Sequence, residues 1–198
     1  ANRLAGYGFV VAAPEIFHRV EPVGTVIEPD AIGRLRGNDA ARRTEIASYD
    51  ADTKAILTWL SEQTEVDEQR LGAIGFCIGG HLSFRAAMRP EVRATACLYP
   101  TGLQNGKLGR GIADSLQRAG EIKGALFTLF GSEDPHVLAE DRDRVLEALQ
   151  GLRHETVLFE ANHTFMRDDG WRWDADLADQ AWAAVITFLR RELSPAQP

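Results

Sequence analysis

Short apolar runs alternate along the chain with longer segments in which apolar residues recur at helical spacing. This alternation is typical of parallel strands that are joined by covering helices. The runs are continuous rather than interrupted by polar residues, which indicates strands that are buried on both faces. The predicted strands cover residues 9–13, 71–75, 94–98, 125–130 and 155–159. The predicted helices cover residues 39–62, 78–88, 140–149 and 175–193.

Two segments keep no steady period and are predicted to be surface loops, residues 14–38 and residues 101–111 ("TGLQNGKLGRG"). Each follows a predicted strand, where long loops often carry function. Within the helix predicted over 39–62, apolar residues recur close to the helical period and form a stripe that faces the core. The stripe consists of Ile46, Tyr49, Ile56, Leu57 and Leu60.

The length of 198 residues predicts one domain over residues 1–198. No apolar run approaches the roughly 18 to 20 residues that a membrane helix needs, so a membrane protein is not expected. The net charge of −7 repels a phosphate backbone, and no Lys/Arg block interleaved with aromatics offsets it. Nucleic acid is therefore not expected as a partner.

The chain has two cysteines, Cys77 and Cys97, which do not indicate a disulfide framework. The amino-terminal residues show no basic region followed by an apolar stretch and a small-residue cleavage site. Both observations predict a cytoplasmic protein.

The stretch "GFCIGGH" follows a predicted strand and opens a predicted helix, with Cys77 at the turn. Strand, sharp turn and helix form a nucleophile elbow, here with cysteine in place of serine. Gly75 and Gly79 are expected to omit Cβ atoms that would crowd this turn. The backbone N–H of Ile78, at the helix N-terminus, is expected to face an oxyanion and to lower the pKa of the thiol.

Two further groups follow later predicted strands: Asp134 in "GSEDPH" and His163 in "EANHTF". In an open α/β sheet, reactive groups gather beyond the carboxyl ends of the strands. The order nucleophile, acid, histidine is the order of the α/β-hydrolase fold. The predicted fold is therefore a mostly parallel sheet with helices on both faces and Cys77, Asp134 and His163 at one edge.

The sequence resembles the dienelactone hydrolase family of α/β-hydrolases, through "GFCIGGH", "GSEDPHV" and "ANHTFMR". The likeness also includes "LAGYGFVVAAPEIF" and extends from about residue 4 to about residue 193. It implies hydrolysis of esters or lactones, with carboxymethylenebutenolidase as the founding activity. It further implies Cys77 as nucleophile, His163 as general base and then acid, and Asp134 as the group that orients the imidazole. A ring-opened thioester is the expected intermediate, and neither metal nor cofactor is expected.

The resemblance also implies substrate-binding residues. Arg167 lies where the family carries a guanidinium that contacts the substrate carboxylate, so a small anionic ester or lactone is the expected partner. Tyr99 lies where the family also has tyrosine. A second arginine comes from the long loop before the first full helix, and the choice stays open among Arg34, Arg36, Arg42 and Arg43. The oligomeric state is not indicated.

The family begins with a strand pair and a helix that have no counterpart here. Those elements carry the second oxyanion N–H and a glutamate that interacts with the resting thiol. The expectation is that the chain is an N-terminally incomplete fragment, or that another segment replaces them. Glu15 in "PEIF" resembles the glutamate motif but follows the wrong strand.

Simpler interpretations stand beside these assignments. Cys77 could be a small core residue, although Asp134 and His163 favour the nucleophile. Cys97 is predicted to be a buried core thiol and His81 a packing residue. The remaining candidates for the acid are Glu133 and Asp141. A glutamine amidotransferase would require a late His-x-Glu pair, which the chain lacks at His163. The alternative function is an inactive α/β-hydrolase scaffold that binds a ligand or protein.

Overall fold

The computed structural model describes residues 1–194, so the last four residues of the expected domain lie outside the described part. Its sheet has four strands in the order β1-β2-β3-β4, and every neighbouring pair is parallel. The strands are β1 (Leu71–Phe76), β2 (Val92–Leu98), β3 (Ala125–Gly131) and β4 (His154–Phe159). These confirm the strands predicted from residue 71 onwards. β2 and β3 are buried almost throughout, whereas the outer strands β1 and β4 are partly exposed, contrary to the expected burial on both faces.

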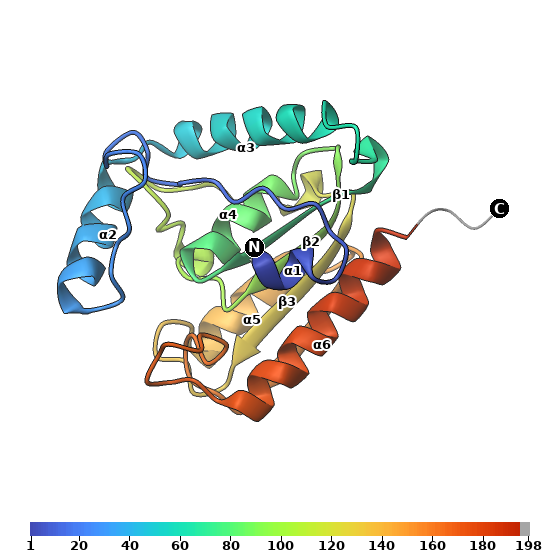
Figure 1. Cartoon of the computed structure of the whole chain (residues 1–198). Coiled ribbons are helices and arrows are strands. Elements are labelled where there is room, and N and C mark those ends of the chain that lie inside the picture. Colours follow the sequence, from blue (N-terminus) through green and yellow to red (C-terminus); the bar gives the residue numbers. More distant parts are fainter. Residues whose placement is uncertain (195–198) are drawn as a thin grey trace.

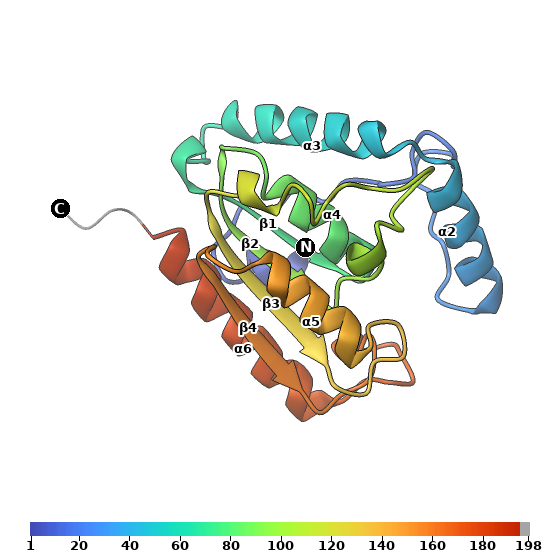
Figure 2. The ribbon, with the colours of Figure 1, turned by 180° about the vertical axis from the view of Figure 1, so that it is seen from behind.

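Helices cover both faces of the sheet (Figures 1 and 2). α6 (Ala175–Glu192) packs on one face, and α4 (Ile78–Ala86) and α5 (Ala139–Ala148) pack on the other. Because successive side chains of a strand point to opposite faces, Ala96 and Leu98 join the α6 core while Cys97 joins the α4 and α5 core. Cys97 is fully buried, as predicted.

The prediction of a single helix over residues 39–62 is wrong. The structure has α2 (Ala31–Arg43) and then α3 (Ile46–Ser61), so α2 also occupies part of the predicted loop 14–38. The backbone is extended at Thr44, whose carbonyl accepts a hydrogen bond of 2.8 Å from the Arg110 N–H. Glu45 forms a parallel bridge with Arg110 and an ion pair of 3.0 Å. These contacts with a distant loop break the helix.

The strand predicted over residues 9–13 is also wrong. After α1 (Asn2–Ala5) this segment has no regular secondary structure, because within residues 1–194 no strand pairs with it and β1 pairs only with β2. A groove of about 720 Å³ is lined by this segment and by β1. Phe9 and Val11 pack against the α6 core. Their apolar pattern therefore reflects burial rather than strand pairing.

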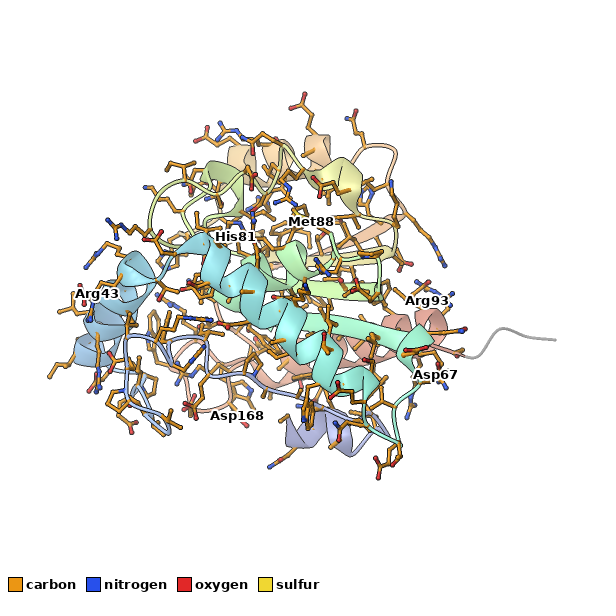
Figure 3. All side chains as sticks on the ribbon, turned by 90° about the horizontal axis from the view of Figure 1, so that it is seen from above. Arg43, Asp67, His81, Met88, Arg93 and Asp168 are labelled. Atoms are coloured by element: carbon orange, nitrogen blue, oxygen red, sulfur yellow. The ribbon has the colours of Figure 1, made fainter. Side chains whose placement is uncertain are left out.

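The carboxyl ends of the strands lie on the same side of the molecule as α2. In Figure 3 the labelled Asp67 and Arg93, near the starts of β1 and β2, lie far from Arg43 of α2. The labelled His81 and Asp168 lie nearer to Arg43. The α2 side is therefore the side of the strand carboxyl ends, where the candidate site is found. Within the described residues, none of the helices combines the length and apolar character needed to cross a membrane.

Candidate active site

Cys77 occupies a sharp turn between β1 and α4, with φ 57° and ψ −122°. This left-handed backbone is unusual for a residue with a side chain. The turn is held by hydrogen bonds from the Cys77 N–H to Leu98 O (3.0 Å) and from the Gly80 N–H to Cys77 O (3.0 Å). A Cβ on Gly75 would lie 1.8 Å from Gly79 O, so Gly75 is required as predicted. Gly79 itself has open space, and Gly80 is instead the second tight position.

Asp134 follows β3, and His163 follows β4. The Nδ1 of His163 lies 2.6 Å from Oδ2 of Asp134, and both side chains are almost completely buried. The other carboxylate oxygen accepts the N–H of His136 at 2.8 Å. This geometry distinguishes Asp134 from its competitors. Glu133 is exposed, and Asp141 accepts the N–H of Leu138 at the start of α5.

The electrostatics of the site favour a charged thiol and imidazole. Burial lowers the pKa of His163, but hydrogen bonds with Asp134 and Cys77 and their charges raise it to about 9. Burial raises the pKa of Cys77, but the effects of His163, with smaller ones from Thr101 and the Ile78 N–H, together outweigh it, so the pKa lies below the ordinary thiol value. The structure thus brings together Cys77, His163 and Asp134, which come from the ends of different strands.

Ile78 and Tyr99 both lie at this centre. Ile78 is the first residue of α4, and its backbone N–H makes a small contribution to the lowered pKa of the Cys77 thiol. Tyr99 is 2% exposed, and its ring lies edge-on to His163 with centroids 5.2 Å apart. Its contact is therefore with the imidazole, and the side chain is closed to solvent.

The candidate arginines differ in whether they form ion pairs with acidic side chains. Arg167 is bound to Asp169 on the surface. Arg36 binds Glu21, and both Arg42 and Arg43 lie beside Asp39. Within residues 1–194, Arg34 has no ion pair. The pKa of His136 is lowered by burial, His163 and Arg172, and Arg34 makes the smallest contribution.

The remaining sequence predictions concern residues away from the thiol. Glu15 accepts the N–H of Gly24 at 3.0 Å and so holds its own loop rather than contacting Cys77. His81 is fully buried, as expected of a packing residue, and its Nε2 lies 2.8 Å from Ser115 Oγ. Burial, assisted by the charge of Arg85, lowers the pKa of His81 to about 4 and keeps it neutral.

Sequence reasoning missed two residues of the site. The ring of His136 lies edge-on to His163, with centroids 4.8 Å apart. Oγ1 of Thr101 lies 3.4 Å from Sγ of Cys77. The available signals were the "GSEDPH" motif for His136 and the irregular segment after β2 for Thr101. Neither signal indicates a contact with a particular side chain.

The parallel sheet with helices on both faces, and a strand-to-helix elbow that carries Cys77, have the architecture of an α/β-hydrolase. Among the described residues there is no cluster of His, Cys, Asp and Glu suited to a metal ion.

The model of the dienelactone hydrolase family matches residues 1–193, and the chain belongs to this family. The chain is therefore a hydrolase of ester bonds. A Saccharomyces cerevisiae protein named "Putative carboxymethylenebutenolidase" is 34% identical, with 97% of this chain and 73% of that protein covered. A carboxymethylenebutenolidase of Pseudomonas sp. strain P51 is 27% identical, with 95% and 75% covered.

A solved structure shows the same fold. It is a dienelactone hydrolase-like promiscuous phosphotriesterase from metagenomic libraries, 22% identical with a TM-score of 0.73. The match covers 96% of this chain and 77% of that one.

Proposed function

We propose that the protein hydrolyses a small, carboxylate-bearing ester or lactone through Cys77, His163 and Asp134, with a thioester intermediate. The observation that carries this proposal is the connection between the three side chains. Nδ1 of His163 lies 2.6 Å from the carboxylate of Asp134, and His163 in turn lowers the pKa of the Cys77 thiol. A thiolate beside an imidazolium is a strong nucleophile near neutral pH.

In the proposed reaction, the thiolate of Cys77 forms a bond to the carbonyl carbon, and the carbonyl oxygen becomes an oxyanion. The Ile78 N–H, at the first turn of α4, donates to this oxygen. The ester C–O bond then breaks, and the leaving oxygen takes the proton of His163. Water next gives a proton to His163 and attacks the thioester, and the C–S bond breaks to release the acid and restore the thiolate.

The substrate class follows from the charges beside the site. Among Arg34, Arg36, Arg42 and Arg43, only Arg34 lacks an acidic partner within the described residues. Its charge makes a small contribution, below that of Arg172, to the lowered pKa of His136, which contacts His163. We assign Arg34 as the arginine that binds the substrate carboxylate, since a guanidinium can hold a carboxylate through two hydrogen bonds. Arg167 can contribute only if it leaves Asp169. The name of the Pseudomonas relative supports a lactone as substrate.

The setting of the reaction belongs to the same proposal. Both cysteines are free thiols, which fits a reducing cytoplasm. The catalytic steps use only side chains and backbone N–H groups of this chain, so the proposal includes neither metal nor cofactor.

The test is turnover of a small aryl ester by the wild type, Cys77→Ala and Cys97→Ala. Cys97 is the matched control, because it is the other thiol and is fully buried. We expect Cys77→Ala to abolish turnover and Cys97→Ala to retain it. Mass spectrometry after rapid acid quenching is expected to show the acyl group on Cys77. Full turnover by a folded Cys77→Ala protein would refute the mechanism, and a folded wild type without turnover or acylation would favour an inactive scaffold.

A further inference from the structure

Thr101 lies in the loop that follows β2, at the same edge of the sheet as the elbow. Its backbone N–H donates to Cys77 O at 3.2 Å, and its hydroxyl oxygen lies 3.4 Å from Cys77 Sγ. The residue therefore contacts both the backbone and the side chain of Cys77. Within residues 1–194, the Thr101 hydroxyl has no other hydrogen-bonding partner.

The backbone around Thr101 is held in place from both sides. A Cβ on Gly80 would lie 3.0 Å from Leu98 O and Pro100 Cα, so the loop presses against the elbow helix at a glycine. Gly102 has φ 72°, and a Cβ there would lie 1.9 Å from Lys107 O. These close approaches fix where the loop lies relative to α4. The hydroxyl is thus presented to the sulfur by a rigid backbone.

The direction of the hydrogen bond depends on the charge of Cys77. A neutral thiol can donate to Thr101 or accept from it, whereas a thiolate can only accept. Hydrogen bonds to charged groups are stronger than those between neutral groups. The Thr101 hydroxyl consequently favours the thiolate, and it contributes to the low pKa of Cys77 after the effects of burial and His163.

We propose that Thr101 is a positioning residue that holds Cys77 as a thiolate, both before attack and when the thioester C–S bond breaks. This inference rests on the proposed function, because it requires Cys77 to be the nucleophile. The sulfur carries negative charge at rest and again as it leaves the acyl carbon, and only in these states does it accept fully from the hydroxyl. Thr101 is therefore expected to assist thioester hydrolysis as well as thiolate formation.

The experiment measures the rate of Cys77 alkylation by iodoacetamide as a function of pH, in a Cys97→Ala background that leaves one thiol. Thr101→Val keeps the shape of the side chain and removes the hydroxyl, and Thr101→Ser keeps the hydroxyl. We expect Thr101→Val to raise the midpoint by about one pH unit, with about tenfold slower alkylation below it. Thr101→Ser is expected to restore the wild-type midpoint.

A matched control is Thr53→Val, which removes a hydroxyl that donates to Tyr49 O in α3, away from the thiol. It is expected to leave the alkylation midpoint unchanged. In acyl-enzyme measurements, Thr101→Val is expected both to form the thioester more slowly and to hydrolyse it more slowly than the wild type. Thr101→Ala serves as a second variant if the Thr101→Val protein does not fold. Thermal unfolding measures whether each variant is folded.

The outcomes separate this inference from the proposed function. If the wild-type midpoint lies below the ordinary thiol value and is unchanged in folded Thr101→Val or Thr101→Ala, the role of Thr101 is overturned. The assignment of Cys77, His163 and Asp134 is unaffected by that result. A midpoint that rises equally in Thr101→Ser also overturns it, because the hydroxyl is retained. A wild-type midpoint at the ordinary thiol value of about 8.5 overturns the proposed nucleophile as well.

Discussion

Replacing Asp134 by asparagine removes the charge that faces His163 while keeping the size of the side chain. The carboxylate is 3% exposed and lies 2.6 Å from His163 Nδ1, so solvent screens the pair very little. The pKa of His163 rises from 6.5 to about 9, which at about 1.4 kcal/mol per pH unit corresponds to roughly 3 kcal/mol in favour of the imidazolium. Burial opposes this rise, so the hydrogen bonds and charges of Asp134 and Cys77 contribute all of it.

Without the carboxylate, only Cys77 supports the imidazolium and burial still opposes it, so we expect the pKa of His163 to fall to about 6.5 or below. At pH of about 7.5 the imidazolium fraction then falls from nearly complete to about one tenth or less, and the thiolate population falls with it. The asparagine amide can also select the wrong imidazole tautomer. We expect kcat/KM for a small aryl ester to fall by about 100-fold or more.

The assay is an NMR titration of the His163 ring, assigned by comparison with His163→Gln, together with steady-state kinetics. Glu133→Gln is the matched control, because it removes the same charge from the neighbouring exposed residue. It is expected to change neither the pKa of His163 nor the kinetics appreciably. The reasoning is refuted if the pKa of His163 in folded Asp134→Asn stays within about half a unit of the wild-type value.

The other predictions concern the thiols, the elbow and the substrate. Near neutral pH, iodoacetamide is expected to alkylate Cys77 but not Cys97, whose burial raises its pKa to about 12; equal labelling in peptide mapping would contradict the assignment. Gly75→Ala places a Cβ 1.8 Å from Gly79 O and is expected to cost about 3 kcal/mol or more in denaturant unfolding. Gly79→Ala meets nothing within 4 Å and is expected to leave stability unchanged or higher, and a reversed order would show that the elbow is packed differently. Arg34→Ala is expected to raise KM by about tenfold for a carboxylate-bearing ester and to leave a neutral ester of similar size unaffected; equal effects would argue against a carboxylate contact.

The sequence pattern was sufficient to predict the four strands, the pairing of the acid with the histidine, and one tight glycine of the elbow. The continuous apolar runs predicted β1 to β4, because strands of a covered parallel sheet bury apolar side chains wherever they pair. The pairing of Asp134 with His163 was predicted from their places after successive strands, because parallel strands end at the same edge. Gly75 was correctly predicted to be a tight position.

Contacts between distant segments decided the rest. Residues 9–13 have the composition of a strand, yet a strand requires a partner, and composition does not show whether one is adjacent. The break between α2 and α3 depends on Arg110, which lies far along the chain from Thr44. Arg34 was chosen because acidic side chains lie beside the other three candidates, Arg36, Arg42 and Arg43, and the sequence does not show those contacts. The role of Thr101 depends on where the loop after β2 lies. Sequence patterns determine which residues are apolar, turn-forming or reactive, whereas folding determines which side chains meet across long separations in the chain.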